Sequence, residues 1–160
     1  MPLTLNGTSG ITTPAGLVIN NAPAFSAYAS VSQTITNGVA TKLQANTEEF
    51  DTNGNYDNVT NYRFTPTVAG YYQVTGQISA TSTLTVTRII PLLYKNGAVV
   101  KYGVDMTATI ASRSIVSSLV YFNGSTDYAE LYTLLFGSGT LSTSINAFDN
   151  YFQAVMVRGA

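Results

Sequence analysis

The sequence predicts an all-β fold, built as a two-sheet sandwich or a barrel, and three observations support this. Short runs rich in Thr, Val, Tyr, Ile and Phe, which favour strands, recur from Pro23 onward. Turn-forming steps separate these runs, and the clearest are Asn37-Gly38, Asn96-Gly97 and Asn123-Gly124. No segment shows the apolar period of a helix.

The expected strands follow one another along the chain, and each ends at Gly, Pro, Asn or Ser breakers. They are residues 24–30, 39–43, 62–64, 70–80, 86–94, 99–104, 114–122, 128–135 and 150–157. Roughly nine short strands in one domain are typical of a sandwich or a barrel. The 160 residues of the chain fit such a single domain, which we place at residues 23–160.

Residues 1–22 differ from the rest, because Gly and Pro interrupt scattered aliphatic side chains and no period is sustained. We expect an extended N-terminal arm that packs against another surface, with a frayed terminus as the alternative. A disordered tail is usually poorer in large aliphatic residues, which favours a docked arm. The expected anchor residues are Leu3, Leu5, Ile11, Leu17 and Ile19.

The composition limits the kinds of partner. Only 9% of the residues are charged, so the surface offers little charge repulsion and suits a fixed assembly. The net charge of −1 includes no basic stripe, which argues against binding to nucleic acid. No apolar run is long enough to span a bilayer and no secretion signal is visible, so we expect synthesis in the cytoplasm without membrane insertion.

The chain contains neither histidine nor cysteine. This excludes nucleophile systems that depend on histidine and zinc sites of the ordinary type. The acidic neighbours Glu48 and Glu49 point to opposite faces of an extended strand, so they do not converge as a catalytic pair. We therefore expect a protein that is not an enzyme and needs no cofactor.

Two expected strands are apolar on both faces, one near residues 87–94 and one near residues 151–157. A sandwich strand buries one face in the core, so a second apolar face needs another cover. In a chain without helices that cover is another subunit or, alternatively, a long loop. The predicted subunit interface consists of Ile90, Leu92, Tyr94, Tyr151, Val155 and Val157.

The order of landmarks along the chain resembles the complement one-q globular-head family, which belongs to the tumour-necrosis-factor-like jelly rolls. The landmarks are Ala24-Phe25-Ser26-Ala27, Phe50-Asp51, Tyr56-Asp57, Phe64-Thr65-Pro66, Gly70-Tyr71-Tyr72, Leu93-Tyr94-Lys95-Asn96-Gly97 and Asn150-Tyr151-Phe152-Gln153-Ala154. The resemblance implies a jelly-roll sandwich of two antiparallel sheets and a compact homotrimer with apolar contacts around its axis. It also implies binding rather than chemistry.

The segment from Leu5 to Ile11, LNGTSGI, is similar to short segments of phage tail and virion proteins. With the predicted jelly roll, it indicates a bacteriophage virion protein. We expect a homotrimeric decoration or cement protein on the outer capsid surface, whose arm contacts the major capsid protein or another virion protein. The alternative is the receptor-binding head of a short tail fibre that recognises a host glycan or surface protein.

Two further sets of residues are candidate sites. Asp51, Asn53, Asn55 and Asp57 place oxygen-bearing side chains at alternate positions, as a calcium loop does, although the same residues favour an ordinary turn. Tyrosine offers contact area and a hydroxyl group at low entropic cost, which suits saccharide or protein ligands. Tyr56 and Tyr102 lie near turns and are the predicted ligand contacts. Four other tyrosines lie in strand runs and are expected to be structural, in the core or an interface, namely Tyr71, Tyr94, Tyr121 and Tyr151.

Overall fold

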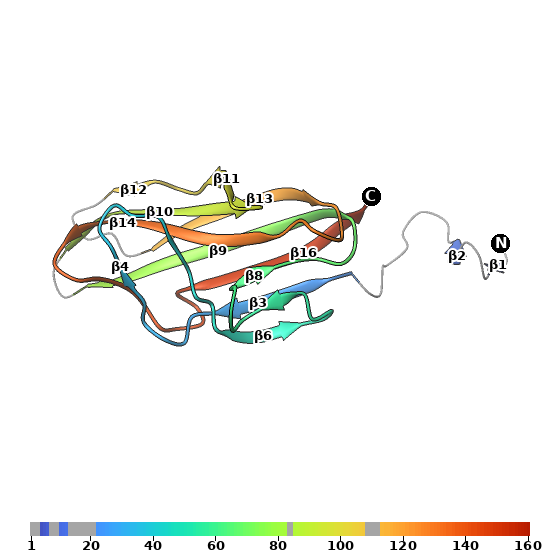
Figure 1. Cartoon of the computed structure of the whole chain (residues 1–160), viewed down its shortest axis with the longest axis horizontal. Helices are drawn as coiled ribbons and strands as arrows, with labels where there is room; N and C mark the ends of the chain where they lie inside the picture. The colour runs from blue at the N-terminus through green and yellow to red at the C-terminus, as the bar shows by residue number, and fades with distance from the viewer. Residues whose placement is uncertain (1–3, 7–9, 13–21, 83–84, 108–112) are drawn as a thin grey trace.

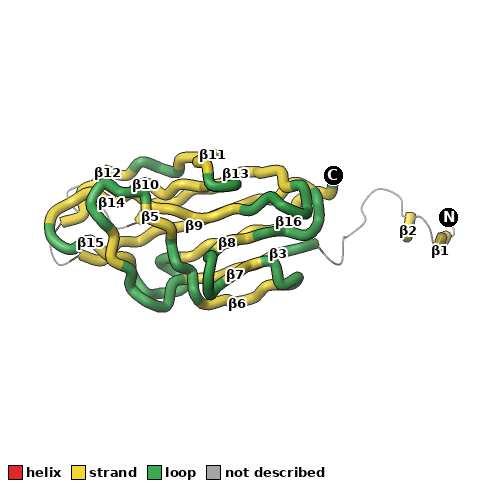
Figure 2. The backbone as a smooth tube through the Cα atoms, in the orientation of Figure 1, coloured by secondary structure: helices red, strands yellow, loops and turns green. Residues whose placement is uncertain are grey.

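The structure, a computed structural model, describes residues 4–6, 10–12, 22–82, 85–107 and 113–160. Every regular element in these ranges is a β-strand (Figure 2), so the described part has no helix that could cross a membrane. Two seven-stranded antiparallel sheets face each other and their strands run along the long axis of the molecule (Figure 1). The predicted all-β sandwich is confirmed.

The first sheet has the order β4-β15-β9-β16-β3-β6, and β13 pairs with the free edge of β9. Its strands are β3 (Ala24–Tyr28), β4 (Thr34–Ile35), β6 (Thr47–Asp51), β9 (Gly70–Ser82), β13 (Arg113–Phe122), β15 (Leu141–Thr143) and β16 (Tyr151–Gly159). The long strands β13, β9 and β16 therefore lie side by side, with β13 at the edge of the sheet.

The second sheet has the order β11-β10-β14-β8-β7, with β12 beside β10 and β5 beside β14. Its strands are β5 (Thr41–Lys42), β7 (Tyr56–Asp57), β8 (Arg63–Phe64), β10 (Thr85–Lys95), β11 (Ala98–Tyr102), β12 (Met106–Thr107) and β14 (Ala129–Ser138). The β10–β11 hairpin turns at Asn96 and Gly97, which both have positive φ as such a turn requires.

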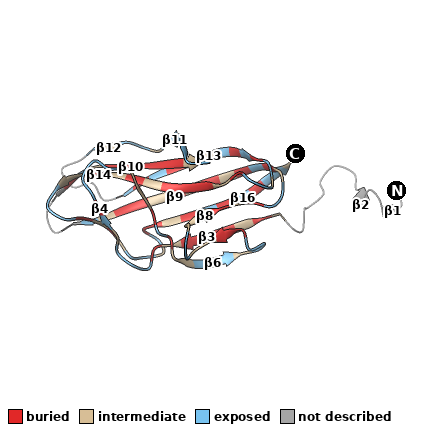
Figure 3. Ribbon diagram, viewed as in Figure 1, coloured by how far each residue is buried: buried red, intermediate tan, exposed pale blue. Residues whose placement is uncertain are grey.

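The core lies between the two sheets and is rich in aromatic rings. Phe25 stacks on Phe64 with 4.5 Å between ring centroids and meets Phe152 edge-on at 5.1 Å. Alternate residues of β16 point into this core, so Phe152, Ala154 and Met156 are buried while Val155 and Val157 are exposed. Figure 3 shows the buried parts of the strands in red and the exposed parts in pale blue. The two-residue period of a strand produces this alternation.

The N-terminal residues include a small sheet of their own. Strands β1 (Thr4–Asn6) and β2 (Gly10–Thr12) pair antiparallel, with Leu5 opposite Ile11. The segment expected to be an extended arm thus contains a paired hairpin. The predicted anchor residues Leu3, Leu17 and Ile19 lie outside the described residues.

Candidate interaction surface

The outward face of the first sheet carries a patch of apolar side chains. Along β13, buried residues alternate with exposed ones, and Leu119 is 55% exposed. We define the open face by the exposed apolar side chains of β13, β9 and β16. They are Tyr71, Ile115, Leu119, Tyr121, Val155 and Val157.

Strand register brings these side chains together from distant parts of the sequence. Tyr121 of β13 lies opposite Tyr71 of β9, with 5.4 Å between their ring centroids. Gln73 of β9 pairs with Leu119 of β13 on one side and with Val155 of β16 on the other. The apolar patch therefore extends across β9 onto β16. The polar residues in the rows of Leu119 and Ser117 are neutral, namely Gln73, Thr75, Ser117 and Gln153, whereas Arg158 lies opposite Tyr71 in the row of Tyr121.

Two shallow hollows lie on this face. The larger has a volume of about 710 Å³ and is lined by Tyr71, Leu119, Tyr121, Val157, Arg158, Gly159 and Ala160. The smaller has a volume of about 260 Å³ and is lined mainly by Phe50, Gln73, Thr75, Gln153 and Val155. Their apolar, open floors suit contact with a protein surface.

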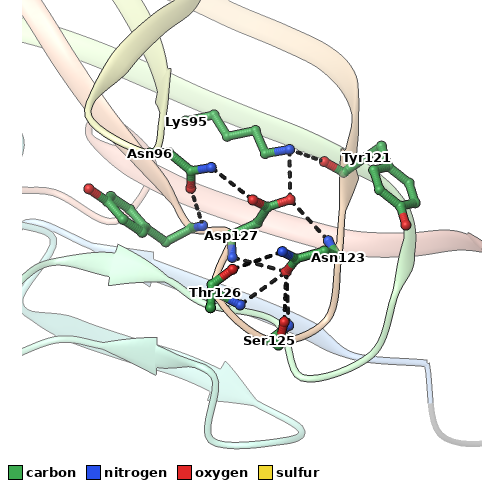
Figure 4. Close-up of polar contacts among 8 residues, drawn as sticks. Lys95, Asn96, Tyr121, Asn123, Ser125, Thr126 and Asp127 are labelled. Carbon is green, nitrogen blue, oxygen red and sulfur yellow. Dashed lines mark hydrogen bonds and ion pairs between the residues drawn. The ribbon is translucent and has the colours of Figure 1, made fainter.

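A polar network braces the backbone behind Tyr121 (Figure 4). The Nζ of Lys95, at the end of β10, lies 2.8 Å from Asp127 Oδ2 and donates to the Tyr121 carbonyl at 2.8 Å. Asn96 Nδ2 donates to Asp127 Oδ1 at 2.8 Å. These donors, Lys95 first, hold the pKa of the Asp127 carboxyl below its usual range. The network therefore fixes the edge of the open face against the second sheet.

The loop between β13 and β14 is also ordered from within. The Asn123 side-chain Oδ1 accepts hydrogen bonds from the backbone N–H groups of Ser125, Thr126 and Asp127, each at 3.0 Å. Gly124 has a φ of +73° and lies against Ala69, where a side chain would collide with the backbone. The Asn-Gly step is thus the local cause of this turn.

The predicted interface residues do not all reach the surface. Val155 and Val157 are exposed on the open face, and Tyr151 and Tyr94 are half-buried. Ile90 and Leu92 are only 6% and 2% exposed. In the strand register, Leu92 lies between Tyr102 and Tyr132 of the same chain. Ile90 and Leu92 are therefore already covered without a second subunit, which removes the reason for assigning them to an interface.

The two predicted ligand tyrosines lie in different environments. The expectation that Tyr56 is exposed was wrong, because the residue is only 6% exposed. Its ring stacks on Phe25 with 4.6 Å between centroids, and its hydroxyl group donates a hydrogen bond to the Ala45 carbonyl. Burial raises its pKa far above the usual range. Tyr102 is 67% exposed, so its role as a ligand contact stays a prediction. Tyr71 and Tyr121, expected to be structural, are exposed on the open face.

The calcium candidates use their oxygens within the turn. Asp51 accepts from the backbone N–H groups of Asn53 and Tyr56, at 3.1 and 2.7 Å. Asp57 accepts from the N–H groups of Val59 and Thr60, at 3.0 and 2.8 Å, which lower its pKa to about 2. The described residues contain no cluster of three or more His, Cys, Asp or Glu side chains that could hold a metal ion. This arrangement favours the turn interpretation of the motif.

Comparison with known proteins supports the fold at low sequence identity. Neither a protein-family profile nor a curated protein matches the sequence. The globular domain of zebrafish complement 1qA matches with a TM-score of 0.64 and 14% identity, over 87% of this chain and 99% of that one. Murine APRIL at pH 8.0 matches with a TM-score of 0.63 and 6% identity, over 85% and 99%.

A third similar structure is Eiger TNF from S. frugiperda, with a TM-score of 0.59 and 10% identity over 87% of this chain and 93% of that one. These matches each cover 85% or more of this chain. The chain therefore has the complement 1q and tumour-necrosis-factor-like jelly-roll fold, as its sequence landmarks predict.

Proposed function

We propose that this chain is a non-catalytic structural protein of a bacteriophage virion, which forms a homotrimer through the open face and decorates the outer capsid surface. The observation that carries the assembly is the open face itself. Leu119 and Val157 are 55% and 59% exposed on β13 and β16, the two long strands that pair with β9. Contiguous exposed apolar patches of this kind mark interaction sites.

A second apolar surface favours a closed ring over a two-fold dimer. The edge strand β11 is exposed along its whole length and includes the apolar residues Val99 and Val100, which are 38% and 41% exposed. It lies next to β13, because the Val104 N–H donates to the Ile115 carbonyl at 2.9 Å. Contact between the edge of one copy and the open face of the next joins two different surfaces, and such contacts form a ring when the rotation between copies closes.

Sequence features support the decoration role and the lack of catalysis. The chain has no histidine or cysteine, and only 9% of its residues are charged. A weakly charged surface suits a protein fixed in an assembly. The similarity of Leu5–Ile11 to virion segments supports attachment through residues 1–22, to the major capsid protein or another virion protein.

Sedimentation and particle binding test this proposal. We expect the purified chain to sediment as a trimer, and we expect the variant lacking residues 1–22 to remain a trimer but to lose binding to empty capsids. A folded monomer at micromolar concentration contradicts the assembly. Trimers that bind capsids equally well without residues 1–22 contradict the anchor.

A second candidate function is a receptor-binding head that recognises a host glycan or surface protein. The observation that favours it is the exposed ring of Tyr102, which lies on the sheet opposite the open face. Trimers that bind host cells but not capsids would support this function over decoration.

A further inference from the structure

The outward face of the second sheet carries a cluster of tyrosines, which we call the tyrosine surface. Leu92 of β10 lies opposite Tyr102 of β11 on one side and opposite Tyr132 of β14 on the other. Tyr94 is two residues further along β10 and points the same way. Its ring stacks on Tyr132, with 4.0 Å between centroids and 24° between planes.

Neighbouring side chains extend this surface and hold its rings. The Arg63 guanidinium lies 4.6 Å from the ring centroid of Tyr128, and Lys42 Nζ lies 5.9 Å from that of Tyr132. Cations over ring faces attract the aromatic quadrupole, so these rings are constrained before any ligand arrives. Prior ordering of this kind lowers the entropic cost of binding.

Two of the cations near this surface are paired with carboxylates of the chain. Lys42 Nζ lies 2.6 Å from Glu130 Oε1, and Arg88 lies 2.6 Å from Asp105 Oδ2. Recognition of phosphate or an acidic polymer depends on free, converging cations. The tyrosine surface instead offers aromatic rings and hydroxyl groups, with Lys42 and Arg88 held against carboxylates and Arg63 over the ring of Tyr128, which suits an uncharged polar ligand.

We infer that the tyrosine surface binds a neutral oligosaccharide, with a sugar ring lying on the exposed ring of Tyr102 and its hydroxyl groups bonded by tyrosine hydroxyls. Tyrosine combines an apolar ring with a polar tip and few rotatable bonds, so it suits both contacts. The inference gives a place and a ligand class to the second candidate function and rests on it. The open face lies on the other sheet, and an assembly whose β11 contact is made by Val99 and Val100 leaves the ring of Tyr102 free.

Titration with neutral oligosaccharides tests the inference on the full chain. The chain has no tryptophan, so its intrinsic fluorescence comes from its eleven tyrosines, and the Tyr102 variants below assign a change to this surface. We expect a saturable change with maltohexaose, cellohexaose or laminarihexaose, with a Kd on the order of 1 mM. We expect Tyr102→Ala to weaken binding about tenfold and Tyr102→Phe to retain most of it.

The controls separate this inference from the proposed assembly. Leu119→Glu, on the open face, should leave oligosaccharide binding unchanged even where it alters sedimentation. Absence of a saturable response to all three oligosaccharides overturns the inference, as does unchanged affinity in Tyr102→Ala. Binding only to heparin, or only to a host surface protein, overturns it as well. Oligosaccharide binding by a chain that sediments as a monomer would instead contradict the trimer alone.

Discussion

Lys95 Nζ lies 2.8 Å from Asp127 Oδ2, and this ion pair joins the end of β10 in the second sheet to the loop that follows β13 in the first. The side chains are only 22% and 12% exposed, so the pair is partly withdrawn from water. Because Lys95 also donates to the Tyr121 carbonyl, the same contact positions the edge of the open face.

We therefore expect Asp127→Ala to lower the free energy of unfolding by about 1–3 kcal/mol, since it leaves the Asn123 N–H and the Lys95 ammonium without their acceptor. Urea unfolding followed by circular dichroism measures this. The control is Asp105→Ala, which removes the exposed Arg88–Asp105 pair and should change the midpoint little. Equal effects of the two variants would show that the Asp127 network does not brace the fold.

The turn carboxylate of Asp57 should make stability depend on acid. Its folded pKa is about 2, below the ordinary value of 3.8, because the N–H groups of Thr60 and Val59 donate to its charged form. A depressed pKa adds stability that is complete above the unfolded value and is lost as the pH falls through the folded value. The difference in unfolding free energy between wild type and Asp57→Asn should thus be constant near neutrality and shrink between pH 3.8 and about 2.

Denaturant unfolding at a series of pH values checks the Asp57 prediction. Glu48→Gln is the control of opposite sign, because burial and then the nearby Asp51 carboxylate raise the pKa of Glu48. The unfolding free energy of Glu48→Gln, relative to that of wild type, should therefore be no lower at neutral pH than at acid pH. If the unfolding free energy of wild type exceeds that of Asp57→Asn by the same amount down to about pH 2, the charged Asp57 carboxylate does not stabilise the turn.

Gly103 allows the edges of the two sheets to approach each other. Its N–H donates to the Pro91 carbonyl at 2.8 Å, and a Cβ at this position would lie 2.5 Å from the Ile115 carbonyl oxygen and 2.8 Å from Val116 Cβ. We expect Gly103→Ala to destabilise the fold by about 1–3 kcal/mol, because backbone must move to admit the methyl group. The thermal midpoint reports this change.

The matched control for Gly103 is Gly159→Ala, where the nearest atom to the added methyl group is Met156 Cε at 3.5 Å. That distance is an ordinary contact, so the same substitution should be nearly neutral there. A neutral Gly103→Ala would mean that the β11 and β13 edges can separate without cost.

The long strands could be predicted because their alternation is local. The expected strands at 70–80, 114–122 and 150–157 agree with β9, β13 and β16 to within their ends. Short strands such as β15 and β7 were not predicted, since two or three residues carry no period. Their conformation depends on partners far along the chain, such as β9 for β15 and β8 for β7.

The site was only partly predictable, because cross-strand neighbours decide what is exposed. Val157 was expected at the surface from the doubly apolar pattern of its strand, and it is exposed. Leu119 was missed although 114–122 is also apolar on both faces, since Ser117 interrupts the outward row. Leu92 was misplaced because its cover, Tyr102 and Tyr132, comes from two other strands.

A charge at the centre of the open face should separate the subunits without unfolding them. Leu119 is 55% exposed, so Leu119→Glu leaves the core intact but requires a carboxylate to be buried in any assembly on this face. We expect sedimentation to change from trimer to monomer, with an unchanged far-ultraviolet circular dichroism spectrum. The control is Val59→Glu, which adds the same charge at a loop residue that is 73% exposed and lies off this face, and it should leave the trimer intact. If Leu119→Glu still sediments as a trimer, the open face is not the subunit contact and another surface must form it.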